Sequence, residues 1–287
     1  MQLMLNILIS TSALGLAAAG ISLGLSTTRQ IPFTLAAAMS TAAYFCHGMY
    51  DAGLPILGAV LLATAIGSAV AYVLDSWLIR PLDEHVCAGW AGVAVSLGAY
   101  MVIQAALAIG FGEAGRTFSL AGRSYAIGTG RLTALQCVLV YTSMGGIGAL
   151  LIVLRFTRIG LAIRGLASNQ ELCELLGVRT SVYRATAVSV SGALASLAGI
   201  LVAVDSGLVG NTGFILFLGG TIAAILGGVG SMWGVAGGAL LLASSQHLVA
   251  YLGDPKWMDT TTFFILILFL SWKPFGFSGR RLKKVEV

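Results

Sequence analysis

The residue types that most often perform catalysis or hold metals are sparse in this chain and poorly placed for either role. His47, His85 and His247 are expected to be isolated, without a carboxylate at helical spacing and without an HExxH pattern that would bring two imidazoles onto one helical face. The cysteines are also widely separated, without a CxxC pair, and small buried apolar roles are the default for them: Cys46, Cys87, Cys137 and Cys173. We therefore predict a chain that is not an enzyme and binds no metal.

Nucleotide hydrolysis and ion coupling are disfavoured as well. No GxxxxGK[ST] phosphate loop occurs, so any use of ATP would depend on a partner. Asp75 and Asp205 lie near the ends of apolar segments, where a charge costs little, and no acid or base is found in the middle of one. A proton-coupled or sodium-coupled carrier is weakened by this pattern, although carbonyl and hydroxyl oxygens alone can hold sodium.

Two polar or glycine-rich breaks could instead bind a solute. Around residues 226–234 a helix could unwind and offer backbone groups, through Gly227, Gly228, Gly230 and Ser231. Close packing of helices on small residues is the plainer explanation and carries more weight. Around residues 27–34 a proline, Pro32, interrupts a run with hydroxyl, amide and aromatic side chains, namely Thr28, Gln30, Phe33 and Thr34. A tight cytoplasmic turn anchored by Arg29 explains this second break equally well.

The polar segment 155–184 has helix signals of its own. Ser168 and Glu171 have the spacing of a capping box, and Gly177 supplies a stop signal. Between them Leu172, Leu175 and Leu176 form one apolar stripe of a short helix over 169–176, with Glu171 and Glu174 on a neighbouring face. A helix this short needs a surface to lie against, either the protein's own spans or a groove in a cytoplasmic subunit.

The composition fixes the elements that must position these segments. Hydrophobic residues make up 57% of the chain and charged residues 9%, with a mean hydropathy of +0.94, whereas about a quarter of residues are charged in soluble domains. We predict an all-α polytopic transmembrane bundle forming one domain over residues 1–287. The first apolar run is expected to be a retained span rather than a signal peptide, because no Lys or Arg precedes it.

Nine spans are expected, and eight is the alternative. Pro32 and the glycines of 214–252 would also be compatible with half-membrane helices. The expected spans are 3–25, 31–50, 54–79, 87–110, 133–154, 184–206, 214–230, 234–252 and 258–273.

The distribution of charge predicts the orientation. Segment 155–184 carries five arginines against two glutamates, and segment 273–287 carries five basic residues against one glutamate, so both are expected in the cytoplasm. Counting back through the spans places the N-terminus in the periplasm. The basic tail 280–287 is explained by attraction to anionic lipid, and nucleic acid is not needed as a partner.

One exterior loop departs from this charge rule. Residues 111–132 carry three arginines against one glutamate, although the count of spans places them outside. Within this loop, residues 117–127 are predicted to form a small exterior hairpin that turns at Ala121-Gly122.

Four ordered blocks resemble the permease subunits of bacterial branched-chain amino-acid ABC transporters. Residues 160–171, followed by 175–178, resemble the cytoplasmic loop of that family, and residues 192–199 resemble its small-residue span. Residues 224–231 resemble its glycine motif, and residues 273–280 its cytoplasmic terminus. The likeness covers roughly residues 133–280, with Arg80-Pro81-Leu82 as a weaker match in the first half.

This resemblance implies a subunit of an importer in the bacterial inner membrane. It implies a second permease, two cytoplasmic ATPase subunits that hold ATP and Mg, and a periplasmic substrate-binding protein. Within the cytoplasmic loop 156–183, residues 164–177 would be the coupling helix. The docking residues would be Arg164, Asn169, Glu171, Leu172, Glu174, Leu175, Leu176 and Gly177.

The first half departs from the family pattern at the expected path. Where the family commonly has Asn-Phe-Ala-His-Gly, this chain has Pro32-Phe33-Thr34-Leu35-Ala36. Branched-chain or other apolar amino acids are the first expected solutes and urea or short amides the next, moved inward by ATP-driven alternating access. A channel or secondary carrier for a small neutral solute is the alternative, while a membrane enzyme and a scaffold are less well supported.

Overall fold

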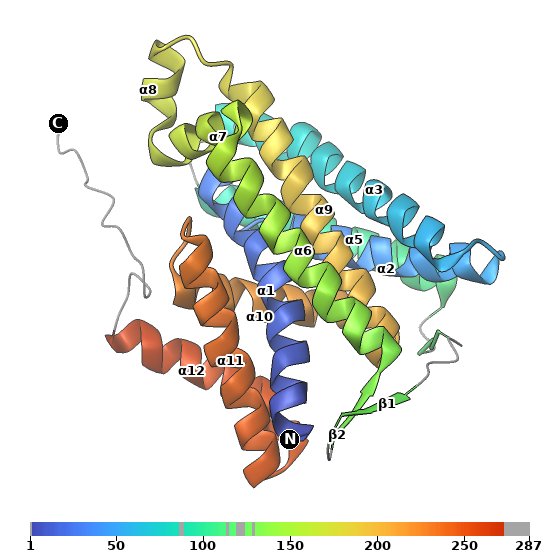
Figure 1. Ribbon diagram of the computed structural model, residues 1–287. Helices are drawn as coiled ribbons and strands as arrows, with labels where there is room; N and C mark the ends of the chain where they lie inside the picture. The colour runs from blue at the N-terminus through green and yellow to red at the C-terminus, as the bar shows by residue number, and fades with distance from the viewer. Residues whose placement is uncertain (1, 86–88, 113–114, 119–123, 128–129, 273–287) are drawn as a thin grey trace.

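A computed structural model describes residues 2–85, 89–112, 115–118, 124–127 and 130–272 of the chain, and within these it is nearly all helical (Figure 1). The basic tail 280–287 and Cys87 lie outside the described residues.

Among the described residues, six helical segments are long and apolar enough to cross a membrane. Three shorter helices lie where the other expected spans were placed: α2 (Thr34–Asp51), α10 (Thr212–Gly227) and α12 (Met258–Trp272). A helix needs about 20 residues to cross the hydrocarbon layer, so the total of eight or nine spans stays a prediction. The six are α1 (Gln2–Thr28), α3 (Ile56–Leu74) with its extension, α5 (Gly89–Phe111), α6 (Ala134–Phe156), α9 (Thr180–Ser206) and α11 (Met232–Leu252).

α1 and α9 lie at the centre of the bundle. Of the most apolar 18-residue stretch of each helix, 72% is buried in α1 and 61% in α9, against 22–28% in the other four spans. α1 packs against α6, α9, α10 and α11, while α2, α3 and α5 form a second group around the other side of α9 (Figure 1).

Small residues allow the central helices to approach closely. The Ser191 hydroxyl of α9 donates to the carbonyl of Gly20 in α1 at 2.6 Å, and a Cβ at Gly20 would lie only 3.0 Å from the carbonyl oxygen of Ser191. Gly199 of α9 lies in the same way against the backbone of Met39 in α2. The glycine content thus serves helix packing in the core, the plainer of the two explanations considered for it.

The end of α3 changes its helical geometry. A five-residue π-helical turn, η1 (Asp75–Ile79), follows α3 directly, and α4 (Arg80–His85) continues from it. A π turn inside an α-helix interrupts the regular α-helical hydrogen-bond pattern and is found preferentially at functional positions. Here it brings Asp75 into the protein interior, with 4% of the residue exposed.

A hairpin lies at the end of the loop in which one was predicted. Strands β1 (Ser124–Ile127) and β2 (Gly130–Thr133) pair antiparallel, with Ile127 opposite Gly130. The connection is therefore at 128–129, and the expected turn Ala121-Gly122 lies outside the described residues. The hairpin predicted over 117–127 therefore stays a prediction.

Candidate docking surface and translocation path

The polar segment 155–184 folds into two helices at one end of the bundle, followed by the start of α9. After α6, Thr157 caps α7 (Arg158–Ser168) by accepting the backbone N–H of Gly160 at 3.0 Å. Ile163 and Leu166 form the buried face of α7, each 3% exposed, while Arg164 lies on its exposed face. α7 packs on α6, α9 and α1, so the expected loop 156–183 is ordered against the spans.

The second helix, α8 (Gln170–Leu175), is capped by Asn169 and not by Ser168. The Asn169 side chain accepts the backbone N–H of Leu172 at 3.1 Å. Ser168 is the last residue of α7, so its backbone is helical, whereas Asn169 is extended with a φ of −151°. An N-cap residue needs the non-helical backbone, and the expected capping box was therefore wrong by one residue.

The stop signal at Gly177 is confirmed. Gly177 has a φ of +77°, its N–H donates to the carbonyl of Glu174, and the Val178 N–H donates to that of Cys173, both at 3.0 Å. These two bonds are the Schellman arrangement that commonly ends helices. Both ends of α8 are thus fixed by local hydrogen bonds, although it has only six residues.

The leucine stripe of α8 faces outward. Leu172 is 53% exposed, Leu175 85% and Leu176 74%, and no residue of α8 is buried. Of the two surfaces considered for this stripe, the protein's own spans are therefore excluded. In Figure 1 α8 projects from the end of the bundle beside α7. Adjacent exposed leucines on a fixed helix are typical of an interaction surface.

Two polar contacts connect this surface to the spans. Glu174 of α8 accepts hydrogen bonds from Gln170 at 3.1 Å and from the Thr180 hydroxyl at the start of α9 at 3.0 Å. One turn further along α9, Arg184 Nη2 lies 3.3 Å from Asp75 Oδ1 in the π turn. These contacts link α8 to the start of α9, and α9 to the π turn after α3.

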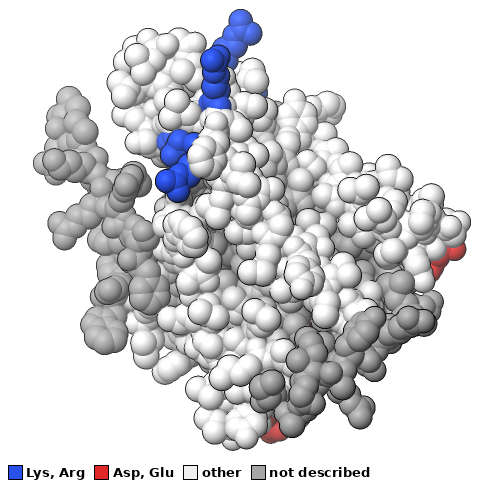
Figure 2. Space-filling view, viewed as in Figure 1, with Lys and Arg blue, Asp and Glu red and all other residues white. Residues whose placement is uncertain are grey.

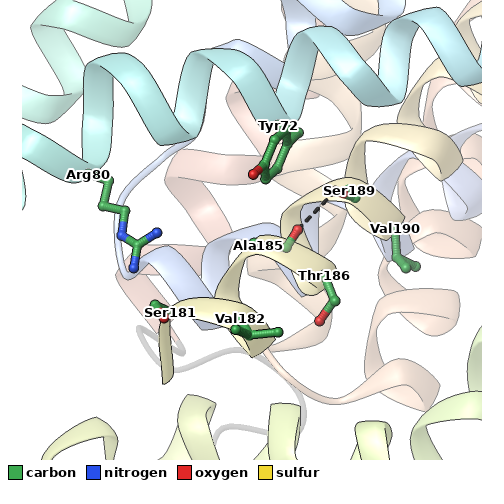
Figure 3. A pocket seen from close by; sticks show the side chains of 8 residues that line it. All are labelled: Tyr72, Arg80, Ser181, Val182, Ala185, Thr186, Ser189 and Val190. Carbon is green, nitrogen blue, oxygen red and sulfur yellow. Dashed lines mark hydrogen bonds between the residues drawn. The ribbon is translucent and has the colours of Figure 1, made fainter. Parts of the chain in front are cut away.

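Three neighbouring cavities surround the first turns of α9. The first, of about 460 Å³, lies between the end of α3 and α9 (Figure 3), and is lined by Tyr72, Arg80, Ser181, Val182, Ala185, Thr186, Ser189 and Val190. The second, of about 590 Å³, lies between α7 and α9. The third, of about 220 Å³, is bordered by Arg80, Glu174 and Arg184. The end of the bundle that carries α8 is thus the part hollowed by these cavities.

Basic and acidic side chains lie at different places on the surface that Figure 2 shows. In Figure 2 the Lys and Arg side chains gather at the end where α7 lies, and the visible Asp and Glu side chains lie at other margins of the molecule. The cytoplasmic placement of this end stays a prediction from the positive-inside rule.

The break between α1 and α2 is a turn in which a threonine hydroxyl hydrogen-bonds to nearby backbone carbonyls. Arg29, the exposed residue after α1, has a φ of +57°, and the Thr28 hydroxyl contacts the carbonyls of Gly24 at 3.0 Å and Gln30 at 3.1 Å. Thr28 and Thr34 are buried. These contacts favour the turn anchored by Arg29, the alternative to a solute site.

Phe33 and Gln30 of this break each reach another helix. The Phe33 ring centroid lies 5.1 Å from that of Phe217 and 6.4 Å from that of Phe214, both in α10. Phe214 in turn stacks on Tyr100 of α5 at 5.2 Å. Gln30 lies close to Gly92 of α5, where a Cβ would overlap its amide. Aromatic rings from the break, α10 and α5 are therefore in contact near the start of α2.

The break between α10 and α11 is closed by backbone contacts. Gly227 lies directly against Gly234, Gly228 and Gly230 have φ of +94° and +86°, and Ser231 caps α11 by accepting the Gly234 N–H at 3.3 Å. The Gly230 N–H donates to the Ser22 hydroxyl of α1 at 3.1 Å. Ser22 precedes Thr28 by six residues, about 9 Å along a helix, so both breaks lie near the same end of α1.

Two pairs of oppositely charged or ionisable side chains were not predicted from the sequence. His47 Nδ1 lies 3.0 Å from Asp51 Oδ2, four residues away on the same helical face, so the expectation that His47 has no neighbouring carboxylate was wrong. The pair of Asp75 with Arg184 joins residues 109 apart, and nothing in the local pattern indicated it. In the part of the chain that the structure describes, no three potential ligands gather into a metal site.

Comparison with known proteins supplies the family. A family model described as the permease component of branched-chain amino acid transport systems matches residues 3–271. The chain belongs to this family. The expected resemblance is thereby confirmed, and the six apolar helices agree with transmembrane permeases.

Curated members of the family give more detail. The chain is 31% identical over 150 residues to the high-affinity branched-chain amino acid transport permease LivH of Salmonella typhimurium, covering 52% of this chain and 49% of LivH. It is 31% identical over 144 residues to BraD of Pseudomonas aeruginosa, covering 50% and 47%. The autoinducer 2 import permease LsrC of Yersinia enterocolitica is 31% identical over 118 residues, covering 39% and 33%. The chain thus spans about half the length of the curated permeases LivH and BraD in these matches.

A solved structure shares the fold. The structure described as PsaBC from Streptococcus pneumoniae in complex with Fab aligns with a TM-score of 0.51, covering 94% of this chain and 91% of that chain. The sequence identity is 11%, so this likeness concerns the fold alone.

Proposed function

We propose that the chain is the membrane permease subunit of an ABC importer. The observation that carries this proposal is the leucine stripe of α8, which is capped at both ends, exposed, and unused by the protein's own spans. A helix with these properties at the basic end of the bundle suits the groove of a cytoplasmic subunit. Family membership supports a transport role.

The proposed coupling runs from α8 through α9 to α3. Approach of two ATPase subunits, which bind ATP and Mg, would press α8 toward the bundle. The bond of Glu174 to Thr180 and the ion pair of Arg184 with Asp75 would convert this into movement of α9 and α3. α9 also packs against α1 and α2, so the movement reaches both predicted path segments. This is alternating access driven from the cytoplasmic side.

The solute proposed is a branched-chain or other apolar amino acid, with urea or a short amide next. The aromatic contacts of Phe33 with Phe214 and Phe217 offer an apolar surface beside the path. The names of LivH and BraD point to branched-chain amino acids, whereas that of LsrC points to autoinducer 2. The remaining partners proposed are a second permease subunit, a periplasmic substrate-binding protein and the inner-membrane lipid. With the basic end that carries α8 in the cytoplasm, the N-terminus is proposed to be periplasmic and the C-terminus cytoplasmic.

Reconstituted vesicles test the proposal. Uptake of radiolabelled leucine is expected only when the permease pair, the ATPases, the binding protein and ATP are all present. A vesicle with an ATPase variant unable to hydrolyse ATP is the matched control. Equal uptake by the permease alone, without ATP, would reject the importer and support a channel or secondary carrier.

A further inference from the structure

The cavity between the end of α3 and the start of α9 combines one cation with an apolar floor. Arg80 extends toward it from α4, and Tyr72 from α3 lies above it, while Ser181, Val182 and Val190 line the opposite side along α9 (Figure 3). Tyr72, Val182 and Val190 are 44%, 51% and 38% exposed, so this side of the cavity opens to the exterior of the bundle. In a membrane protein that exterior is lipid.

The position along α3 indicates the depth in the membrane. Trp77, in the π turn just before Arg80, is 78% exposed. Exposed tryptophan is enriched where hydrocarbon meets the headgroups. Arg80 lies three residues further toward the basic end of the bundle, which places its guanidinium at the level of the phosphates. From Val182 to Val190 the cavity follows α9 for eight residues, about 12 Å toward the membrane centre. The hydroxyls of Thr186 and Ser189 within this stretch donate to backbone carbonyls of α9.

We propose that this cavity binds one anionic phospholipid of the cytoplasmic leaflet. The lipid phosphate lies at Arg80 and the Ser181 hydroxyl, and one acyl chain lies along Tyr72, Val182 and Val190. A basic pocket between membrane helices on the cytoplasmic side is the arrangement that recognises anionic headgroups, and guanidinium suits phosphate oxygens geometrically. The assignment of the leaflet rests on the proposed orientation.

The same site adjoins the coupling route. Arg80 and Ser181 also border the third cavity, whose other walls include Glu174 of α8 and Arg184 of the ion pair. A phosphate at Arg80 therefore lies beside both contacts that connect α8 to the spans. Bound lipid would hold α3 and α9 together at the place where the proposed movement passes between them.

Lipid retention tests this site separately from transport. The purified protein, in nanodiscs of equal phosphatidylglycerol and phosphatidylcholine, is transferred to detergent, and retained lipid is measured by native mass spectrometry. Retention of phosphatidylglycerol over phosphatidylcholine is expected, falling about tenfold or more in Arg80→Gln, the factor that a direct hydrogen bond between charged groups contributes. Arg80→Lys keeps the charge and is expected to retain most of the preference. Arg155→Gln, an exposed arginine at the end of α6, is the matched control and is expected to behave as wild type.

A second variant keeps the test valid if Arg80→Gln fails to fold. Ala185→Phe is expected to fill the cavity and reduce retention while leaving every charge in place. Added inorganic phosphate is expected to leave retention unchanged, because it lacks the acyl chain. Equal retention of both lipids by the wild type would overturn the proposal. A disulfide between two copies of the chain that each carry Val190→Cys, formed with an added oxidant such as copper phenanthroline, would also overturn it, by showing that a second subunit covers the cavity.

Discussion

Asp75 and Arg184 form an ion pair of 3.3 Å that joins the π turn after α3 to the second turn of α9, with 6% and 12% of the two side chains exposed. The pair connects the two helices that border the first cavity. Of the two polar contacts in the proposed coupling route, it joins the residues that lie farther apart in the sequence.

Removing one partner of this pair is expected to be strongly destabilising. Asp75→Asn or Arg184→Gln alone removes one charge of a buried ion pair, at a cost of about 3–5 kcal/mol. The double variant is expected to lose less than the sum of the two. Thermal unfolding of the detergent-solubilised protein measures this, and strict additivity would show that the pair contributes no coupling energy.

The close approach of α10 and α11 predicts a contrast between two glycines. A Cβ at Gly227 would lie 2.3 Å from the backbone of Gly234, whereas one at Gly237 would meet nothing within 4 Å. Gly227→Ala is expected to destabilise by about 1–3 kcal/mol or more through overpacking. Gly237→Ala is expected to be neutral or stabilising by up to about 1 kcal/mol, since alanine is the better helix former. Equal melting temperatures for the two variants would contradict the packing described.

The cap of α8 predicts another contrast, between adjacent residues. Asn169→Ala removes the acceptor for the Leu172 N–H and should cost about 1 kcal/mol of local helix stability. Ser168→Ala should have little effect, because Ser168 belongs to α7. Amide hydrogen exchange of residues 171–174 reports the difference directly. Faster exchange in Ser168→Ala than in Asn169→Ala would restore the capping box expected from the sequence.

The contact of Ser22 with the α10–α11 break is testable in transport. Ser22→Ala leaves the Gly230 N–H without its acceptor and should loosen the junction of α1 with residues 228–231. We expect a reduced rate of ATP-driven uptake with little change in the amount of folded protein. Ser26→Ala provides the control, because the Ser26 hydroxyl bonds within α1 to the Leu23 carbonyl. Identical losses in both variants would show that the interhelix bond has no special effect.

Local patterns predicted the elements far better than their relationships. Apolar runs located a helix at each of the nine expected spans, and Gly177 marked a helix end correctly, because these signals depend on neighbouring residues. The cap was displaced by one residue because Ser168 and Asn169 are both good caps, and only the backbone decides between them. Composition did not reveal that α1 and α9 form the centre, since all the spans are apolar.

The candidate site shows the same division. The leucine stripe could be predicted because its spacing is local, whereas its exposure required the position of α8 relative to α7 and α9. The contacts of Asp75 with Arg184 and of Phe33 with α10 join segments far apart in the chain, and no single-sequence pattern encodes them. The roles predicted for the residues near 27–34 and 226–234 in a solute path stay predictions.

The central claim is that α8 is the docking site for the ATPase subunits. Leu172→Asp combined with Leu175→Asp places two charges on the exposed stripe, and Leu172→Met with Leu175→Met is the matched control that keeps it apolar. Because these side chains are outside the core, both variants are expected to fold and to melt like the wild type. Co-purification with the ATPase subunits is the direct measurement. The account predicts that the Asp variant loses the ATPases while the Met variant retains them, and undiminished association of a folded Asp variant would contradict it.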